Sequence, residues 1–176
     1  MAALSGVCVW FTGLPCAGKT TLATHLAEHL RARGERVAIF DGDQVRSSLS
    51  ADLGFSREHR HANVLRVAAA ARDVIADGAI AICALVSPYA QSREEARRLV
   101  GAERFIEVYV STQVEICEAR DVKGLYRLAR SGKLEHFTGV NDPYEPPERP
   151  DVAVVGIGDP DEVILKIVEE LDRCRA

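Results

Sequence analysis

Apolar residues along this chain form two kinds of pattern that alternate. Five short apolar runs, rich in β-branched and aromatic residues, have the length of buried strands. They cover residues 7–11, 37–40, 79–85, 105–110 and 151–155. Between them lie stretches in which apolar residues recur every three or four positions, the spacing of one helix face. Strands that alternate with helices predict an α/β fold in three layers, with a central parallel five-stranded sheet flanked by helices.

Three of the expected helices have clear apolar stripes. The first begins near Gly18 and ends near Gly34, the second precedes the third strand, and the last closes the chain. Their stripes are, in order, Leu22, Leu26 and Leu30; Val64, Val67, Ala68, Ala71 and Val74; and Val163, Ile164, Ile167, Val168 and Leu171. No repeat, low-complexity segment or linker interrupts the pattern, so residues 1–176 are expected to form a single domain.

The turn between the first strand and the first helix has a recognisable motif. Residues 13–20 read GLPCAGKT and match G-x-x-x-x-G-K-[S/T], the loop that wraps nucleotide phosphates. The glycines allow successive N–H groups to converge on one anion, and the helix start adds its positive dipole end. Lys19 adds a charge near the β- and γ-phosphates, and Thr20 offers a hydroxyl to Mg²⁺. A plain glycine turn with a solvated Lys19 is the alternative, but the flanking elements favour a phosphate site.

An acidic pair follows the second strand. Ligands of a parallel sheet bind beyond the carboxyl ends of its strands, so Asp41 and Asp43 are expected near the phosphate loop. The third strand runs into residues 86–88 and brings no acid, although many phosphate-loop enzymes place a metal-binding aspartate there. This pattern assigns the metal and base roles to Asp41 and Asp43. A turn with Asp43 as a helix N-cap is the alternative, and the two interpretations are compatible.

Further cations and aromatic residues lie outside the motif. Arg46, with a helical face formed by Arg60, Asn63 and Arg66, predicts either a solvated surface or an anion pocket opposite the loop. Residues of about 120–140 are rich in cations and have few large apolar side chains, which indicates a basic lid rather than a core helix. A solvated surface helix is the alternative there. Aromatic residues in the loop after it either stack on a base or pack.

Composition excludes several other classes of function. The formal charge of −4 gives no support to nonspecific nucleic-acid binding. Five cysteines form no C-x-x-C pair and no metal spacing with histidine, which is typical of reduced cytosolic thiols. No apolar stretch reaches membrane-spanning length, and no basic segment precedes the first apolar run. We therefore expect a cytoplasmic protein with neither nucleic acid nor membrane as a partner.

A series of short blocks resembles one family over nearly the whole chain. In order, these are residues 13–21, DGDQVR at 41–46, LGF at 53–55, Arg60 with Asn63, SPY at 87–89, RDVKGLY at 120–126, FTG at 137–139 and DPYE at 142–145. Together they resemble the adenylyl-sulfate kinase (APS kinase) family of phosphate-loop kinases. The resemblance implies phosphorylation of adenosine 5′-phosphosulfate at its 3′-hydroxyl by ATP, with Mg²⁺, in sulfate activation. Relatives are often dimers, so a homodimer is one expectation.

The resemblance also implies roles for residues on the ATP side. ATP would contact Gly13, Cys16, Ala17, Gly18, Lys19, Thr20, Thr21 and Arg120. Thr20 would bind Mg²⁺, and Asp41 would act through the water shell of the metal. Asp43 would orient or deprotonate the 3′-hydroxyl, and Lys123 would close over the transferring phosphate. Arg120 would lie near the ATP base.

On the acceptor side, the implied contacts come from several elements. Arg46, Arg60 and Asn63 would hold the phosphosulfate end, while Phe55 and Phe137 would enclose the adenine. The remaining implied contacts are Asp43, Ser87, Lys123, Leu125 and Thr138.

The chain departs from the family pattern at several positions. Pro15 and Cys16 stand where Ser-Gly is commoner, so autophosphorylation of a loop serine is excluded. The other departures are His59, Ala62, Leu65 and Ala90, where Asp, Glu, Arg and Arg are usual. They affect the expected positioning of the anion face but replace no residue assigned to catalysis.

Two alternative functions remain at this stage. One is a phosphate-loop kinase for another small hydroxyl substrate, such as a sugar, although the pair Phe55 and Phe137 suits an adenine-bearing acceptor. The other is a catalytically silent nucleotide-binding regulatory module, which the intact Lys19, Thr20 and Asp43 argue against.

Overall fold

The computed structural model describes residues 6–176, and its strands form one parallel sheet in the order β2-β3-β1-β4-β5. The strands are β1 Cys8–Thr12, β2 Val37–Asp41, β3 Ile80–Ala84, β4 Phe105–Val110 and β5 Val152–Val154. Each lies within two residues of its predicted position. The predicted central parallel five-stranded sheet is therefore confirmed.

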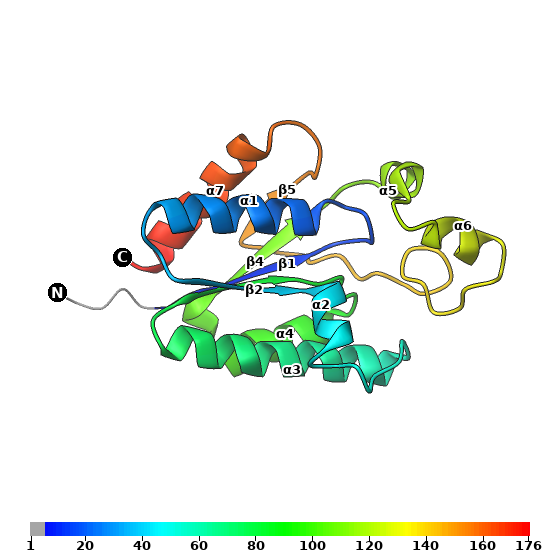
Figure 1. Cartoon of the computed structure of the whole chain (residues 1–176), viewed down its shortest axis with the longest axis horizontal. Coiled ribbons are helices and arrows are strands. Elements are labelled where there is room, and N and C mark those ends of the chain that lie inside the picture. The colour runs from blue at the N-terminus through cyan, green and yellow to red at the C-terminus, as the bar shows by residue number, and fades with distance from the viewer. Residues whose placement is uncertain (1–5) are drawn as a thin grey trace.

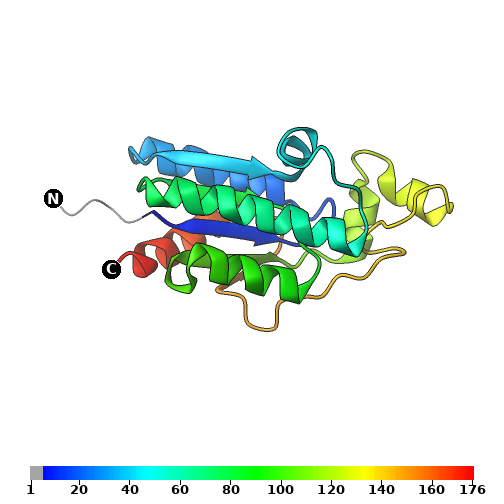
Figure 2. The same cartoon turned by 90° about the horizontal axis from the view of Figure 1, so that it is seen from below.

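Helices cover both faces of this sheet, as Figures 1 and 2 show. Helices α1 (Lys19–Ala32) and α7 (Pro160–Cys174) pack on one face, and α3 (Arg57–Ala76) and α4 (Ala90–Val100) on the other. The shorter elements are α2 (Gly42–Ser47), the 3₁₀ turn Ala102–Arg104, α5 (Val114–Arg120) and α6 (Leu125–Arg130). Within residues 6–176, no helix has the length and apolar character needed to cross a bilayer.

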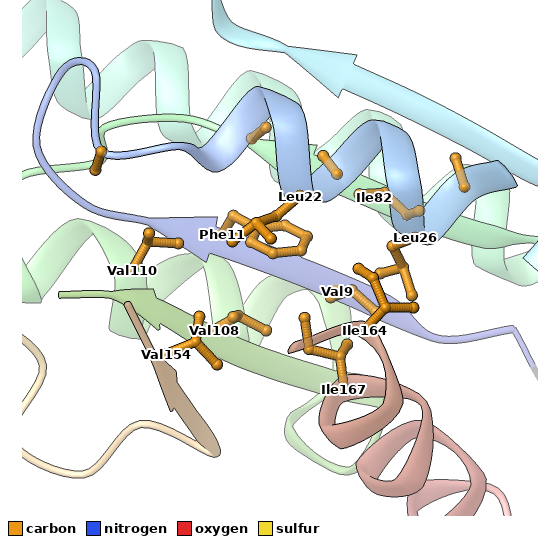
Figure 3. Close-up of a cluster of buried hydrophobic side chains, with 14 of the residues drawn as sticks. Val9, Phe11, Leu22, Leu26, Ile82, Val108, Val110, Val154, Ile164 and Ile167 are labelled. Atoms are coloured by element: carbon orange, nitrogen blue, oxygen red, sulfur yellow. The ribbon is translucent and has the colours of Figure 1, made fainter. Parts of the chain in front are cut away.

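Alternating side chains of the strands supply two separate cores. In β1, Val9 and Phe11 face α1 and α7, whereas Cys8 and Trp10 face α3 and α4. This alternation is the period of two that any strand imposes, and burial on both faces explains why the strands read as continuous apolar runs. Figure 3 shows Phe11 packed between the side chains of α1 and those of β4, with Ile164 and Ile167 of α7 beside them.

The register of the sheet brings the functional loops to one edge. Thr12 ends β1 beside Tyr109, and Asp41 ends β2 beside Ala84. The loops that follow these strands therefore emerge on the same side, where α5 and α6 also lie (Figure 1).

The segment expected to be a basic lid is better packed than its composition indicated. Tyr126 is wholly buried and Ala129 is nearly so, and both belong to the core cluster that contains α1 and α7. The Tyr126 ring meets the edge of the Phe137 ring, with 4.9 Å between centroids. The expectation that this stretch would make a poor core helix is wrong for α6, because Tyr126 anchors that helix to the core.

Helix α7 provides a direct test of this core. Ile167 is fully buried, whereas Leu165 on the same helix is 60% exposed. We expect Ile167→Ala to lower the free energy of unfolding by about 2–5 kcal/mol, because it leaves a cavity against α1. Leu165→Ala should change it by less than about 0.5 kcal/mol. Urea unfolding followed by circular dichroism measures both, and equal effects would contradict the described packing.

Candidate active site

The phosphate loop joins β1 to α1 in a conformation that needs its glycine. Gly18 is the N-cap of α1 with φ 107°, a left-handed geometry that side chains rarely adopt. Cys16 also has a left-handed backbone, with φ 62°. No side chain caps the first turn of α1. Its unpaired N–H groups are therefore directed at the loop, where an anion would bind.

Lys19 is bonded to the loop that precedes it. Its Nζ donates to the carbonyl oxygens of Gly13 and Leu14 at 2.9 and 2.7 Å. The side chain is 8% exposed, and burial lowers the pKa of Lys19 from its ordinary value of 10.5 to about 8, although nearby thiols and the carboxylates of Asp41 and Asp43 oppose this shift.

The next three carbonyl groups of the loop are held from outside it. Tyr126 donates to Pro15, Arg120 to Cys16 and Thr112 to Ala17, at 2.9, 3.0 and 2.7 Å. With Lys19, every carbonyl from residue 13 to residue 17 accepts a hydrogen bond. The loop carbonyls are thus satisfied within the protein, which leaves the N–H side of the loop for phosphate oxygens.

Gly156, just after β5, completes the support of the loop. Its N–H donates to the Thr112 hydroxyl at 2.9 Å, and its carbonyl accepts from Arg120. A Cβ at this position would collide with the Ala17 carbonyl. This contact was not predicted from the sequence. The position of Gly156 after the fifth strand was the one signal for it, because residues that follow a strand of a parallel sheet lie at the edge where ligands bind.

The acidic pair begins α2. Asp41 is the N-cap and accepts from the Asp43 N–H at 3.0 Å, so the alternative interpretation, in which Asp43 is the cap, is wrong. The shift arises because β2 extends through Asp41 and α2 starts at Gly42. The Thr20 hydroxyl donates to the Asp41 carboxylate at 2.7 Å.

These oxygen donors fit a hard divalent cation. A hydroxyl and a carboxylate are the ligand types that Mg²⁺ prefers, and this metal usually takes its remaining ligands from water and substrate phosphates. Within the part of the chain that the structure describes, no cluster of three or more His, Cys, Asp or Glu side chains is arranged to hold a metal. Thr20 and Asp41 fit a metal that is held jointly with the phosphates of a nucleotide.

The lid segment reaches the acidic pair through one lysine. Lys123, in the turn between α5 and α6, forms an ion pair with Asp43. Both side chains are more than half exposed, so the attraction is screened by water and adds little to stability. The contact nevertheless places a cation and a carboxylate together beside the phosphate loop.

Two cavities of about 500 and 520 Å³ meet at this point. The larger one lies over the phosphate loop and is lined by residues 16–22, Arg120 and residues 155–160, with Val163 of α7. All predicted ATP contacts line it except Gly13, whose carbonyl instead accepts from Lys19. Cys16, Lys19, Thr20, Asp43, Val122 and Lys123 line both cavities.

The other cavity contains every residue predicted to contact the acceptor. They are Asp43, Arg46, Phe55, Arg60, Asn63, Ser87, Lys123, Leu125, Phe137 and Thr138. Arg66 is not among its lining residues and instead pairs with Asp52 at the surface. The structure thus brings the predicted acceptor residues together from five stretches of the chain, at 43–46, 55–63, 87, 123–125 and 137–138.

The polar groups of this second cavity are arranged for an anion. The guanidiniums of Arg46 and Arg60 lie 4.7 and 5.5 Å from the centre of the Phe55 ring, which is exposed to the cavity mouth. Burial lowers the pKa of both arginines, and the proximity of Arg60 adds to the effect on Arg46. Asn63 and Thr138, which line the same cavity, each have a buried side-chain oxygen without a hydrogen-bond partner. Unpaired buried polar groups need an explanation, and contact with a bound ligand is one.

Comparison with known proteins gives a consistent result. The family model "Adenylylsulphate kinase" matches residues 5–155. An adenylyl-sulfate kinase of Synechococcus sp. (strain JA-2-3B'a(2-13)) is 52% identical over 147 residues, which are 84% of this chain and 83% of the relative.

Solved structures extend the likeness to three dimensions. The APS kinase CysC of Mycobacterium tuberculosis, in complex with AMPPNP and APS, superposes with a TM-score of 0.91 at 36% identity, covering 96% of this chain and 98% of that one. A hexameric APS kinase from Thiobacillus denitrificans gives a TM-score of 0.74 at 35% identity, covering 97% of this chain but 29% of the other. By its motifs, fold and site, this chain belongs to the adenylyl-sulfate kinase family.

Proposed function

We propose that this protein transfers the γ-phosphate of ATP to the 3′-hydroxyl of adenosine 5′-phosphosulfate, giving 3′-phosphoadenosine 5′-phosphosulfate and ADP. One observation carries this proposal: two cavities, one on the phosphate loop and one lined by arginines and aromatics, meet at Lys19, Asp43 and Lys123. A phosphoryl transfer needs two substrates that face each other across such a junction.

On the donor side, the loop N–H groups and Lys19 would bind the phosphates. Lys19, whose ammonium group donates to two loop carbonyls, would bring its charge to the phosphate oxygens, and Arg120 and residues 155–160 would enclose the base. Thr20 and Asp41 would hold Mg²⁺, Asp41 through water. When bound with ATP, Mg²⁺ supplies neutralisation of the phosphate charge.

On the acceptor side, Arg46 and Arg60 would bind the phosphosulfate, and Asn63 would complete its polar contacts. Phe55 and Phe137 line the same cavity and would enclose the adenine between them.

At the junction, Asp43 would accept or orient the proton of the attacking 3′-hydroxyl. Lys123 would move from Asp43 to the charge that develops on the transferring phosphoryl group. The surrounding lid residues would exclude water, which prevents hydrolysis of ATP.

One relative, the APS kinase from Thiobacillus denitrificans, is hexameric. The homodimer expected from the resemblance stays a prediction.

The proposed reaction is tested by ADP release with ATP, Mg²⁺ and adenosine 5′-phosphosulfate, with AMP in place of the acceptor as the control. We expect turnover only with the phosphosulfate, and a loss of about 100-fold or more in Lys19→Ala and Asp43→Ala, because each removes a group that acts at the reacting atoms. Lys133→Ala, an exposed cation outside both cavities, should retain activity. Tight ATP binding without acceptor-dependent ADP would instead support the regulatory module.

The depressed pKa of Lys19 predicts a proton linkage. Free protein loses the Lys19 proton near pH 8, whereas phosphates favour its charged form. Nucleotide binding between about pH 8 and 10 should therefore take up a proton, and affinity should fall by up to about tenfold per pH unit as the pH rises. Calorimetry in buffers of different ionisation enthalpy measures this uptake.

Lys19→Arg is the matched control for that linkage, because arginine stays protonated throughout this range and the neighbouring thiols are unchanged. If the variant takes up as many protons as the natural protein, Lys19 is not the source.

The contact between Tyr126 and Pro15 predicts an effect on nucleotide binding. Tyr126→Phe keeps the ring against Phe137 but leaves the Pro15 carbonyl of the phosphate loop without its donor. Nucleotide affinity should fall by about 1 kcal/mol, roughly fivefold. Tyr109→Phe, whose ring stacks on Tyr144 rather than on the loop, serves as the control. Equal nucleotide affinities in the two variants would refute this assignment.

A further inference from the structure

Arg93 is a buried arginine that touches neither cavity. It projects from α4, is 3% exposed, and pairs with the Glu107 carboxylate of β4 at 3.0 Å. Burial raises the pKa of Glu107 even though Arg93 and Arg97 oppose the shift. The direction is that of a carboxylate whose desolvation costs free energy. A buried ion pair is weak support for stability by itself, so its other contacts indicate why it is present.

Two further bonds of Arg93 connect separate segments of the chain. Its Nη1 donates to the Ser87 carbonyl at 2.8 Å, and its Nη2 to the Glu145 carbonyl at 2.7 Å. One planar guanidinium thus joins β4, the turn after β3, and the segment of residues 142–145, which runs past α4 (Figure 2).

The turn held by this guanidinium has an unusual backbone. Ser87 has φ 39°, a left-handed conformation that is uncommon outside glycine. The Trp10 indole N–H donates to its hydroxyl at 3.0 Å, and the Thr12 hydroxyl donates to the preceding carbonyl of Val86 at 2.7 Å. Such strain persists only where the surroundings determine it. Ser87 and Pro88 are wall residues of the acceptor cavity.

The 142–145 segment is fixed to the same turn. The Glu145 N–H donates to the Pro88 carbonyl at 2.8 Å, and its carboxylate accepts from the Ala90 N–H at 2.7 Å. At the other end of the segment, Asp142 lies 4.0 Å from Arg60 and donates its N–H to the Phe137 carbonyl. The segment therefore helps to fix the positions of Phe137 and Arg60, both of which line the acceptor cavity.

We propose that Arg93 is a positioning residue of the acceptor site, which sets the distance between the Ser87 wall and the Phe137 wall of that cavity. This inference rests on the proposed function for the identity of the acceptor. The proposal gives Arg93 no role in the donor cavity, because neither Ser87 nor Glu145, whose carbonyl groups Arg93 bonds, lines that cavity.

The test separates positioning from neutralisation of a buried charge. Arg93→Lys retains a cation opposite Glu107 but lacks the planar fork that reaches two carbonyl groups. We expect its KM for adenosine 5′-phosphosulfate to rise about tenfold, since small misplacements of binding groups are costly. Its KM for ATP and its affinity for ADP should change less than about twofold. Arg93→Met should show the same selective effect with a lower melting temperature.

Two further variants complete the experiment. Arg97→Met removes an arginine one turn later on α4 that bonds Phe105 and Asp151, away from the cavity, so it should lower stability without changing either KM. Tyr144→Phe removes the contact of the segment with the Thr12 hydroxyl at 2.9 Å and should raise the acceptor KM alone.

The outcomes are distinguishable. The proposal is overturned if Arg93→Lys keeps the acceptor KM of the natural protein. It is also overturned if the KM for ATP and the KM for the acceptor rise together in every Arg93 variant, because the residue would then act only through stability. If the unaltered protein shows no turnover with the phosphosulfate, the proposed function fails instead.

Discussion

The structure depends on keeping the carbonyl groups of the phosphate loop turned away from its ligand. A loop that offers N–H groups to an anion must satisfy five carbonyls elsewhere, because a lone pair aimed at phosphate would repel it. This protein does so with donors from Lys19, Tyr126, Arg120 and Thr112. Three of these four come from beyond β4, so the far half of the chain folds around the first loop. The lid segment is for this reason part of the loop's support as well as a cover.

Much of the fold followed from local sequence signals. Strand runs, helix stripes and the glycine motif each determine structure over a few residues, and a parallel sheet then places all strand ends at one edge. The residues predicted to contact the acceptor line one cavity, and each of them lies in a block that the family resemblance made recognisable. Asp41 and Asp43 were expected at this edge, and the structure places both there.

Other features required contacts between distant residues that no local pattern encodes. Tyr126 looked like one aromatic in a charged stretch, and its burial depends on the space left between Phe137 and the loop. Asp41 rather than Asp43 is the N-cap because β2 extends through Asp41. The apolar content of a sequence does not locate such a strand end to the residue. Gly156 had no motif of its own, and only its contact with Ala17 reveals why a side chain is excluded.

Gly156 lies just beyond the residues that the family model matches. The family model matches residues 5–155, whereas one wall of the donor cavity is formed by residues 155–160 and continues to Val163. Helix α7, which follows, also forms half of one layer over the sheet. A chain shortened to residues 5–155 would keep the glycine motif but would lose Gly156, which packs against Ala17 of that motif. The family model therefore includes the glycine motif but only part of the cavity that lies over it, because the rest of that cavity's lining continues into the first turn of α7.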